Sequence, residues 1–215
     1  MLQACHHILL ENPGQTVEEV RPWLERSSAA MENMKGLIDD MLTLSAMDSA
    51  RRLPRRETVS ISAVVTKAVL QMEPMAYDRG VSLDSQVQEN VNVLGDEEAL
   101  MRVASGLMEN ALKYEPQNGR IAVNLSARGR RAMLQVQNFG AAIAPEDLPY
   151  VFDRFYKVDK AHSGKGSGLG LSIAKELWKW MGEELTVEST KGKGTCFRFT
   201  ISRPDPRKLE HPEEA

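Results

Sequence analysis

The 215-residue sequence has only two cysteines, Cys5 and Cys196, and they lie far apart in the chain. Their spacing fits no metal-ligand motif, and so few thiols are simplest to reconcile with a reducing compartment. No apolar run reaches the length of a membrane span, and the first residues lack the long apolar core of a signal peptide. The chain also lacks an excess of positive charge, with 27 Lys and Arg against 30 Asp and Glu, which argues against nucleic-acid binding by the whole chain.

The chain has instead a glycine pattern at residues 164–173 that runs directly into an amphipathic helical pattern. Four glycines stand there at alternate positions. Glycine permits positive φ and close approach of a ligand, and a helix start offers free N–H groups and partial positive charge to an anion. The spacing excludes both the Gly-x-Gly-x-x-Gly motif and the P-loop. We interpret the stretch as a phosphate-binding loop, because a flexible hinge does not need four spaced glycines before a helix.

The first quarter of the sequence predicts helices. Residues 16–19 form a capping box, after which apolar residues recur every three or four positions to about Ser49, with nearly a heptad period. Pro22 either kinks this helix or marks its start. The helix before Asn12 is too short to cover the whole apolar seam, so we expect self-association into a helical bundle. Packing of the long helix on its own domain is the alternative.

Beyond a basic linker, helical and strand patterns alternate. Helices are predicted at 61–78, 97–114 and 171–181, and strands at 58–60, 81–83, 91–94, 121–125, 133–136, 185–187 and 196–201. The last four strands pair as two hairpins. The pattern predicts an α+β fold, a two-layer α/β sandwich with helices on one face of a mostly antiparallel sheet, preceded by a helical hairpin segment.

A long loop of about twenty residues, 144–165, is predicted between a strand and the glycine pattern. Long loops in compact domains are usually functional or mobile. We expect the aromatic residues of this loop to pack and hold its base, while the rest closes over a ligand.

Three segments are predicted to converge on one pocket. The first is residues 109–114 at a helix end, where Asn110 offers a neutral oxygen to Mg²⁺ and Lys113 can meet a phosphate. The second is residues 138–143, which leave a strand, and the third is the glycine pattern. Together they indicate a site for a phosphorylated ligand and Mg²⁺.

In order and spacing these segments resemble the ATP-binding domain of bacterial sensor histidine kinases, within the superfamily that includes gyrase, Hsp90 and the MutL proteins. The resemblance covers roughly residues 58–202 and implies a Bergerat-type ATP-binding fold. The segments that carry it are 108–114 (N box), 138–143 (first glycine box), 152–157 (F box), 164–173 (second glycine box) and 192–197 (closing strand). Residues 33–48 also resemble the second helix of the family's dimerisation hairpin.

The resemblance implies ATP and Mg²⁺ as ligands and gives each matching residue a role. Asn110 would bind Mg²⁺, and Asn138 stands where the family usually has an Asp that accepts from the adenine amino group. An amide oxygen can accept the same hydrogen bond without charge. The nucleotide-binding residues implied are Asn110, Lys113, Tyr114, Asn138, Gly140, Ile143, Lys157, Gly166, Gly168, Leu169, Gly170, Leu171 and Thr195.

Three departures from the family pattern bear on activity. Gly106 stands where the family usually has the first Asn of its N box, and Ala142 replaces a glycine. No histidine lies in the family's His-Glu/Asp-x-x-x-Pro setting, so we interpret the chain as beginning after the phosphoacceptor. His6 and His7 are then ordinary helix residues, and the histidines at 162 and 211 are poorer candidates still.

These features favour an ATP-binding catalytic region of a two-component sensor histidine kinase that transfers the γ-phosphoryl group to a histidine on another chain. The alternatives are a non-catalytic ATP-binding dimeric regulator and a Ser/Thr kinase of the anti-sigma-factor type. We expect a partial dimerisation hairpin at 1–52, a linker at 53–57, the catalytic domain at 58–203 and a disordered tail at 204–215. The resemblance implies a response regulator as partner, a homodimer through residues 17–49 and a cytoplasmic location, alone or as the cytosolic part of a membrane-bound kinase.

Radiolabelled ATP should transfer no acid-labile, base-stable phosphate to His6 or His7, because neither is followed by an acidic residue. Label on the chain after incubation with Mg·ATP should stay at background. Label that appears, and vanishes in His7→Ala, would contradict the assignment.

Overall fold

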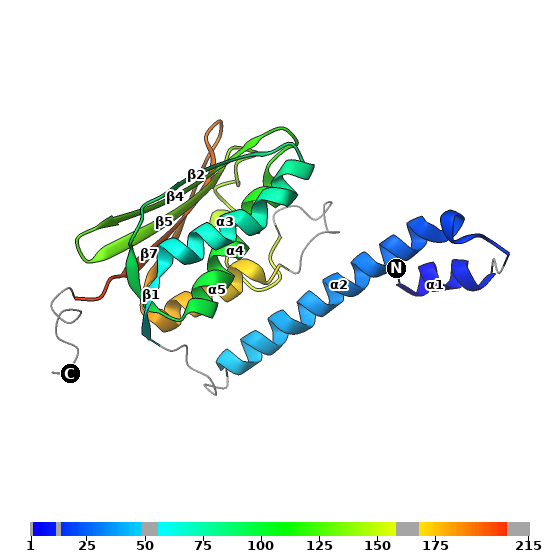
Figure 1. Ribbon diagram of the computed structural model, residues 1–215, viewed down its shortest axis with the longest axis horizontal. Helices are drawn as coiled ribbons and strands as arrows, with labels where there is room; N and C mark the ends of the chain where they lie inside the picture. Colours follow the sequence, from blue (N-terminus) through cyan, green and yellow to red (C-terminus); the bar gives the residue numbers. More distant parts are fainter. Residues whose placement is uncertain (1, 12–13, 49–55, 158–167, 206–215) are drawn as a thin grey trace.

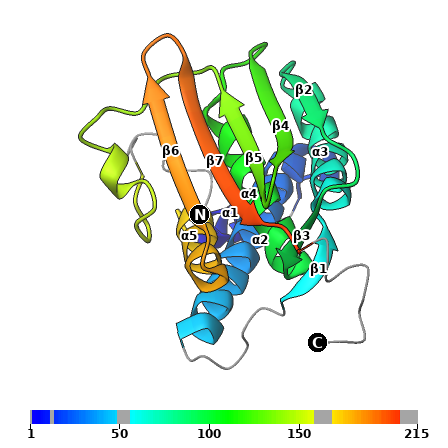
Figure 2. The same cartoon turned by 90° about the vertical axis from the view of Figure 1, so that its left-hand side faces the viewer.

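The structure is a computed structural model that describes residues 2–11, 14–48, 56–157 and 168–205. A helical arm, α1 (Leu2–Glu11) and α2 (Val17–Asp48), precedes an α/β body (Figure 1). In the body, helices α3 (Ile61–Asp78), α4 (Glu97–Tyr114) and α5 (Gly170–Met181) cover one face of a five-stranded sheet, whose other face is open (Figure 2). The predicted α+β class, with its helical segment in front, is confirmed.

The sheet has the order β2-β4-β5-β7-β6, and only the β2–β4 pair is parallel. Its strands are β2 (Ser82–Val87), β4 (Arg120–Arg128), β5 (Arg131–Asn138), β6 (Glu184–Thr190) and β7 (Gly194–Ser202). A separate antiparallel pair, β1 (Glu57–Ser60) with β3 (Asn92–Gly95), closes one end of the body. Both predicted hairpins, β4–β5 and β6–β7, are present.

The core lies between the inner face of the sheet and the three helices. In β5 the side chains of Ala132, Leu134 and Val136 are fully buried and alternate with half-buried neighbours. Val136 is paired in register with Val123 of β4 and Phe197 of β7, so one apolar row crosses three strands. Burying side chains of this size stabilises a fold by roughly 1.5–3 kcal/mol each.

Local signals in the sequence account for the ends of two helices of the body. The Asp96 carboxylate accepts a hydrogen bond from the backbone N–H of Ala99 at 3.0 Å and caps α4. Gly182, at φ 70°, ends α5 in the left-handed conformation. The strand β2 is longer than predicted, because an edge strand with exposed polar residues shows no apolar alternation.

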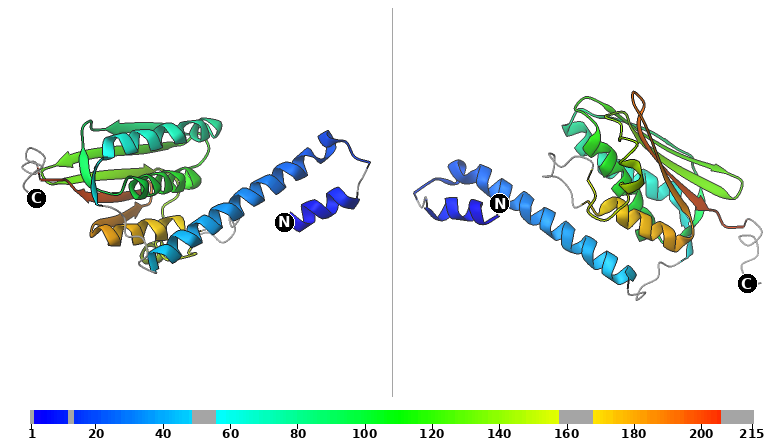
Figure 3. Two further views of the ribbon diagram at one scale, coloured as in Figure 1. Left: turned by 60° about the horizontal axis from the view of Figure 1, so that its bottom comes forward. Right: turned by 180° about the vertical axis from the view of Figure 1, so that it is seen from behind.

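The arm projects away from the body (Figure 3). At the start of α2 the Glu19 carboxylate accepts from the N–H of Thr16 at 2.7 Å, as a capping box requires, and Pro22 lies inside the helix. α1 packs against α2, and Leu37 packs against the body's core. Much of the predicted apolar seam is exposed, namely Leu24, Met31, Met34, Ile38 and Met41.

Within the described ranges, none of the helices combines the length and the apolar character that crossing a lipid bilayer requires.

Candidate nucleotide-binding site

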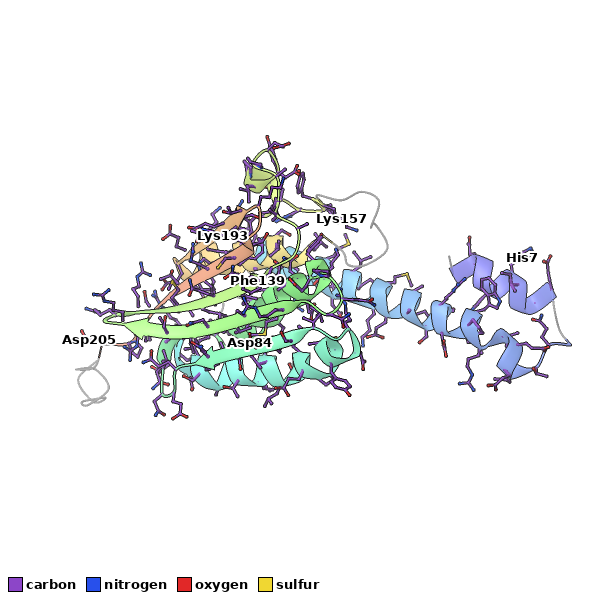
Figure 4. All side chains as sticks on the ribbon, turned by 90° about the horizontal axis from the view of Figure 1, so that it is seen from above. His7, Asp84, Phe139, Lys157, Lys193 and Asp205 are labelled. Atoms are coloured by element: carbon purple, nitrogen blue, oxygen red, sulfur yellow. The ribbon has the colours of Figure 1, made fainter. Side chains whose placement is uncertain are left out.

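The predicted site residues fall in three groups. One surrounds the end of β5 (Asn138, Gly140, Ile143, Thr195), one occupies the last turn of α4 (Asn110, Lys113, Tyr114), and one surrounds the start of α5 (Lys157, Gly168, Leu169, Gly170, Leu171). α4 and α5 pack against one another beneath the sheet. Gly166 lies outside the described residues. Figure 4 shows Lys157 between the body and the arm, whereas Asp205 lies at the opposite end of the body.

The amide of Asn138 is the most distinctive feature of the first group. Asn138 ends β5, in register between Ile121 and Thr195, and is 2% exposed. Its Nδ2 is buried and has no hydrogen-bond partner among the described residues. A buried, unpartnered amide nitrogen costs free energy unless something else accepts its hydrogens. The end of β5 therefore presents a donor that is left for a ligand or water.

A small hydroxyl network attaches the segment after β5 to the neighbouring hairpin. The Ser189 Oγ of β6 lies 2.7 Å from the Thr195 Oγ1 of β7 and accepts a hydrogen bond from the N–H of Ile143 at 2.8 Å. Thr195 and Ile143 were predicted as site residues, but Ser189 was not. A serine on an edge strand carries no signal in the sequence, because such positions are usually solvated.

Two glycines let the backbone segments approach closely here. A Cβ on Gly194 would lie 2.6 Å from the Cα of Phe139, and Gly194 has a φ of 77°. A Cβ on Gly140 would lie 3.1 Å from the Cδ of Pro116, just beyond α4. The segment after β5 is thus held between the end of α4 and the β6–β7 hairpin, with no room for side chains at these two positions.

Glu115 is a functional candidate that sequence analysis missed. It follows α4 directly and is only 3% exposed. Its Oε2 accepts hydrogen bonds from the backbone N–H groups of Phe139 at 2.6 Å and Gly140 at 2.9 Å. Its Oε1 accepts a hydrogen bond from the backbone N–H of Arg120 at 3.0 Å. In the polar sequence after α4 such a glutamate is expected to be solvated, so the pattern gives no sign of its burial.

The end of α4 is held from the other side by Arg79, which follows α3. Its guanidinium donates to the carbonyl oxygen of Glu115 at 2.7 Å and also to that of Leu112. Carbonyl groups in the last turn of a helix have no partner within the helix, so this arginine supplies one. The last turn of α4, which carries Asn110 and Lys113, is therefore fixed on two sides.

The second group presents polar and cationic groups along that last turn. Asn110 is half-buried, and the Lys113 Nζ lies 4.9 Å from the centre of the Tyr114 ring. Burial, and then the negative charge of Asp40 in α2, raise the pKa of the neighbouring Glu109 carboxyl. The arm thus brings a carboxylate close to the helix end that carries Asn110.

Aromatic residues hold the base of the long loop, as expected. The Phe152 ring meets the Phe197 ring edge-on at 6.1 Å, and the Tyr150 and Tyr156 rings lie 5.7 Å apart. The Tyr156 hydroxyl donates to the Asp147 carboxylate at 2.6 Å. Phe155 departs from this pattern, since its side chain is 60% exposed.

The start of α5 combines a left-handed glycine with a buried leucine. Gly168 has a φ of 75°, and its carbonyl accepts from the N–H of Phe155 at 3.1 Å. The position that a Cβ of Gly168 would take is 3.4 Å from the Lys157 Cε, so this lysine lies over the helix start. Leu169 is fully buried in the core, so only its backbone is available to a ligand.

Two hollows of the body lie elsewhere. One of about 470 Å³ lies beside the start of α3, and one of about 420 Å³ lies on the open face of the sheet. Neither is lined by a predicted nucleotide-binding residue. Within the described part of the chain, no three His, Cys, Asp or Glu side chains cluster as metal ligands. His7 pairs with Glu11 on the exposed tip of the arm, far from the site (Figure 4).

The profile of the histidine kinase-, DNA gyrase B- and HSP90-like ATPase family matches residues 95–205, which is more than half of the chain. The chain belongs to this family. The matched range contains the described residues of all three groups.

Comparison with similar proteins shows which kind of protein within this family the chain resembles. The sensor-like histidine kinase SenX3 of Mycolicibacterium smegmatis is 31% identical over 192 residues, which are 88% of this chain and 50% of that protein. The sensor histidine kinase CusS of Escherichia coli is 35% identical over 191 residues, 87% of this chain and 39% of that protein. The chain thus spans half or less of these relatives, and its body is an ATP-binding catalytic domain of the sensor histidine kinase type.

Solved structures agree with this assignment. The mycobacterial sensor histidine kinase MprB is 28% identical with a TM-score of 0.58, and the match covers 70% of this chain and 99% of that one. Full-length ShkA, solved in complex with AMPPNP, has a TM-score of 0.75 over 90% of this chain and 41% of that one. At 23% identity, ShkA supports the fold alone.

The loop base gives a prediction for pH dependence. The hydrogen bond to Asp147 raises the pKa of Tyr156 to about 12, above the value of about 10 for an unfolded tyrosine. The stabilisation of the folded state by this hydrogen bond is therefore fully present below about pH 10 and is lost as the pH rises through about 12. In an ultraviolet titration, Asp147→Asn should move the last tyrosine step toward pH 10 and Tyr156→Phe should remove it. A last step unchanged in both variants would contradict the assignment.

Proposed function

We propose that this chain binds Mg·ATP at the end of β5 and between the ends of α4 and α5, and transfers the γ-phosphoryl group to a histidine on another chain. The observation that carries the proposal is the buried Asn138 amide, whose Nδ2 has no partner among the described residues, in a fold that belongs to an ATPase family. The match to an ATPase family supports ATP as the nucleotide, and ShkA, which shares the fold, was solved with AMPPNP bound.

The residues around the end of β5 fit an adenine base. The Asn138 amide offers an oxygen that can accept from the exocyclic amino group and a nitrogen that can donate to a ring nitrogen. Thr195 lies beside it in the hydroxyl network. Gly140 and Gly194 carry no side chains there, so the backbone can approach a flat ligand closely.

The last turn of α4 fits a magnesium ion held mainly by phosphates. Mg²⁺ usually keeps several waters and takes only one or two protein ligands, so the Asn110 oxygen is a sufficient contribution. When bound, Mg²⁺ neutralises charge on the phosphates. Lys113 and Lys157 would contact the phosphates as point charges, and the backbone N–H groups at the start of α5 would donate to them. Catalysis by these residues would consist of positioning and charge neutralisation.

The proposal extends to organisation and partners. We assign residues 1–52 to a partial dimerisation hairpin, 53–57 to a linker, 58–203 to the catalytic domain and 204–215 to a tail, of which 206–215 lie outside the described residues. The exposed apolar seam of α2 supports a homodimer. A complex of the histidine kinase ThkA with the response regulator TrrA supports a response regulator as partner. A cytoplasmic location follows from the same assignment.

A non-catalytic ATP-binding regulator is the second candidate, and Gly106 favours it. The family's usual Asn is missing there, yet a Cβ on Gly106 would meet no other atom within 4 Å. Packing therefore does not require a glycine at this position. The absence of the family's asparagine side chain is then better explained by a change in function, such as the loss of catalysis. The exposed seam of α2 argues against the third candidate, an anti-sigma-factor type of kinase.

Asn110→Ala should weaken Mg·ATP binding at least about tenfold, because it removes the one neutral oxygen that the last turn of α4 offers to the metal. Isothermal titration calorimetry on the purified chain measures this. The matched control is Asn124→Ala, which removes an equally half-buried asparagine from the open face of the sheet and should leave affinity unchanged. Equal affinities in wild type and Asn110→Ala would overturn the assignment of the site.

A further inference from the structure

Glu115 joins two parts of the nucleotide site that the sequence keeps apart. It sits between the last turn of α4, with Asn110 and Lys113, and the segment after β5, with Asn138 and Gly140. Its carboxylate accepts three backbone hydrogen bonds of 2.6–3.0 Å, two of which come from the two residues that follow Asn138. We infer that Glu115 is a positioning residue that holds the base-contacting segment of the nucleotide site in place.

The chemistry of this position demands a carboxylate. Three N–H donors converge on one side chain, and an ionised carboxylate is the side chain that accepts at both oxygens and donates at neither. A glutamine could keep its amide oxygen toward Phe139 and Gly140, but its N–H₂ group would then face the N–H of Arg120. Only removal of the whole carboxamide or carboxylate takes the acceptor from the loop. Hydrogen bonds to ionised groups are also the stronger kind, which suits a contact that must fix a loop.

The Glu115 side chain occupies space that is available only because residue 119 is a glycine. A Cβ on Gly119 would lie 2.8 Å from both the Cγ and the Cδ of Glu115. The Arg79 guanidinium holds the Glu115 carbonyl at 2.7 Å, so both the main chain and the side chain of this residue are fixed. The Arg120 guanidinium lies 4.1 Å from the centre of the Phe139 ring and adds a second restraint on the same loop.

Glu115 would affect ligand binding through the Asn138 amide, whose position depends on the path of the segment that follows it. Asn138 ends its strand, and only the path of residues 139 and 140 decides how the chain leaves the sheet beside that amide. Without the carboxylate, two part-buried N–H groups lose their acceptor and the segment must shift to find water. The base end of the site would then lose its geometry, while the metal end at Asn110 would be retained.

The chain offers a matched control at the other end of the sheet. The Glu183 side chain is 2% exposed, accepts from the N–H of Ser202 at 2.8 Å and pairs with Arg131. It is therefore a second buried glutamate that receives a backbone hydrogen bond. It lies where β5 begins and β7 ends, away from Asn138. A variant of Glu183 reports the general cost of disturbing such a carboxylate.

This inference rests on the proposed ATP binding, and calorimetry of the full chain with Mg·ATP and Mg·ADP tests it. Glu115→Ala should weaken both nucleotides at least about tenfold and by the same factor, because both share the base. Hydrogen exchange at the Phe139 and Gly140 amides should accelerate. Glu183→Ala should change either affinity less than about twofold, whatever it does to thermal stability.

Four outcomes would count against this inference. If wild type binds no Mg·ATP, the proposed function fails, and this inference fails with it. If wild type binds and Glu115→Ala binds equally well, the positioning role alone is overturned, whether or not its loop amides exchange faster. The same holds if the Glu115 and Glu183 variants lose affinity alike. Should Glu115→Ala not fold, Glu115→Asp keeps the charge but shortens its reach, so it should weaken both nucleotides about threefold. Unchanged affinity in that variant would also overturn the inference.

Discussion

The candidate site depends on how the chain leaves the sheet at Asn138. Up to that residue, backbone groups of β5 find partners in β4 and β7. Beyond it the N–H groups of Phe139 and Gly140 are no longer in a ladder, and a buried N–H without an acceptor costs about 1–3 kcal/mol. The Glu115 carboxylate supplies that acceptor. Because it belongs to the end of α4, satisfying the backbone also joins the two halves of the site.

The same region shows why small residues occur where they do. The segment after β5 passes between α4 and the β6–β7 hairpin, and the absence of side chains at Gly140 and Gly194 sets the separation. The Ser189 and Thr195 hydroxyls then fix the far end of the segment through Ile143. The backbone beside the buried Asn138 amide is therefore restrained on both sides. Such preorganisation is what a nucleotide site requires, since it lowers the cost of ordering on binding.

Much of the fold could be predicted from the sequence, because its signals are local. The Asp96 cap, the glycine that ends α5 and the two hairpins depend on neighbours within a few residues. The order of the glycine boxes likewise identified the family. Glu115, Ser189 and Arg79 could not be predicted as they occur, because each acts on backbone groups far away in the sequence. The sequence alone does not show whether a glutamate is buried or solvated, and only the tertiary structure distinguishes the two.

A nucleotide bound where α4, the end of β5 and the start of α5 meet would change the amide environments of all three segments. Titration of Mg·ATP into the ¹⁵N-labelled chain, followed by amide chemical shifts, detects this change residue by residue. The largest shifts should fall on Asn138 and Gly140, on Asn110 and at the start of α5. Shifts confined to the hollow on the open face of the sheet, around Gln135 and Arg198, would contradict this location of the nucleotide.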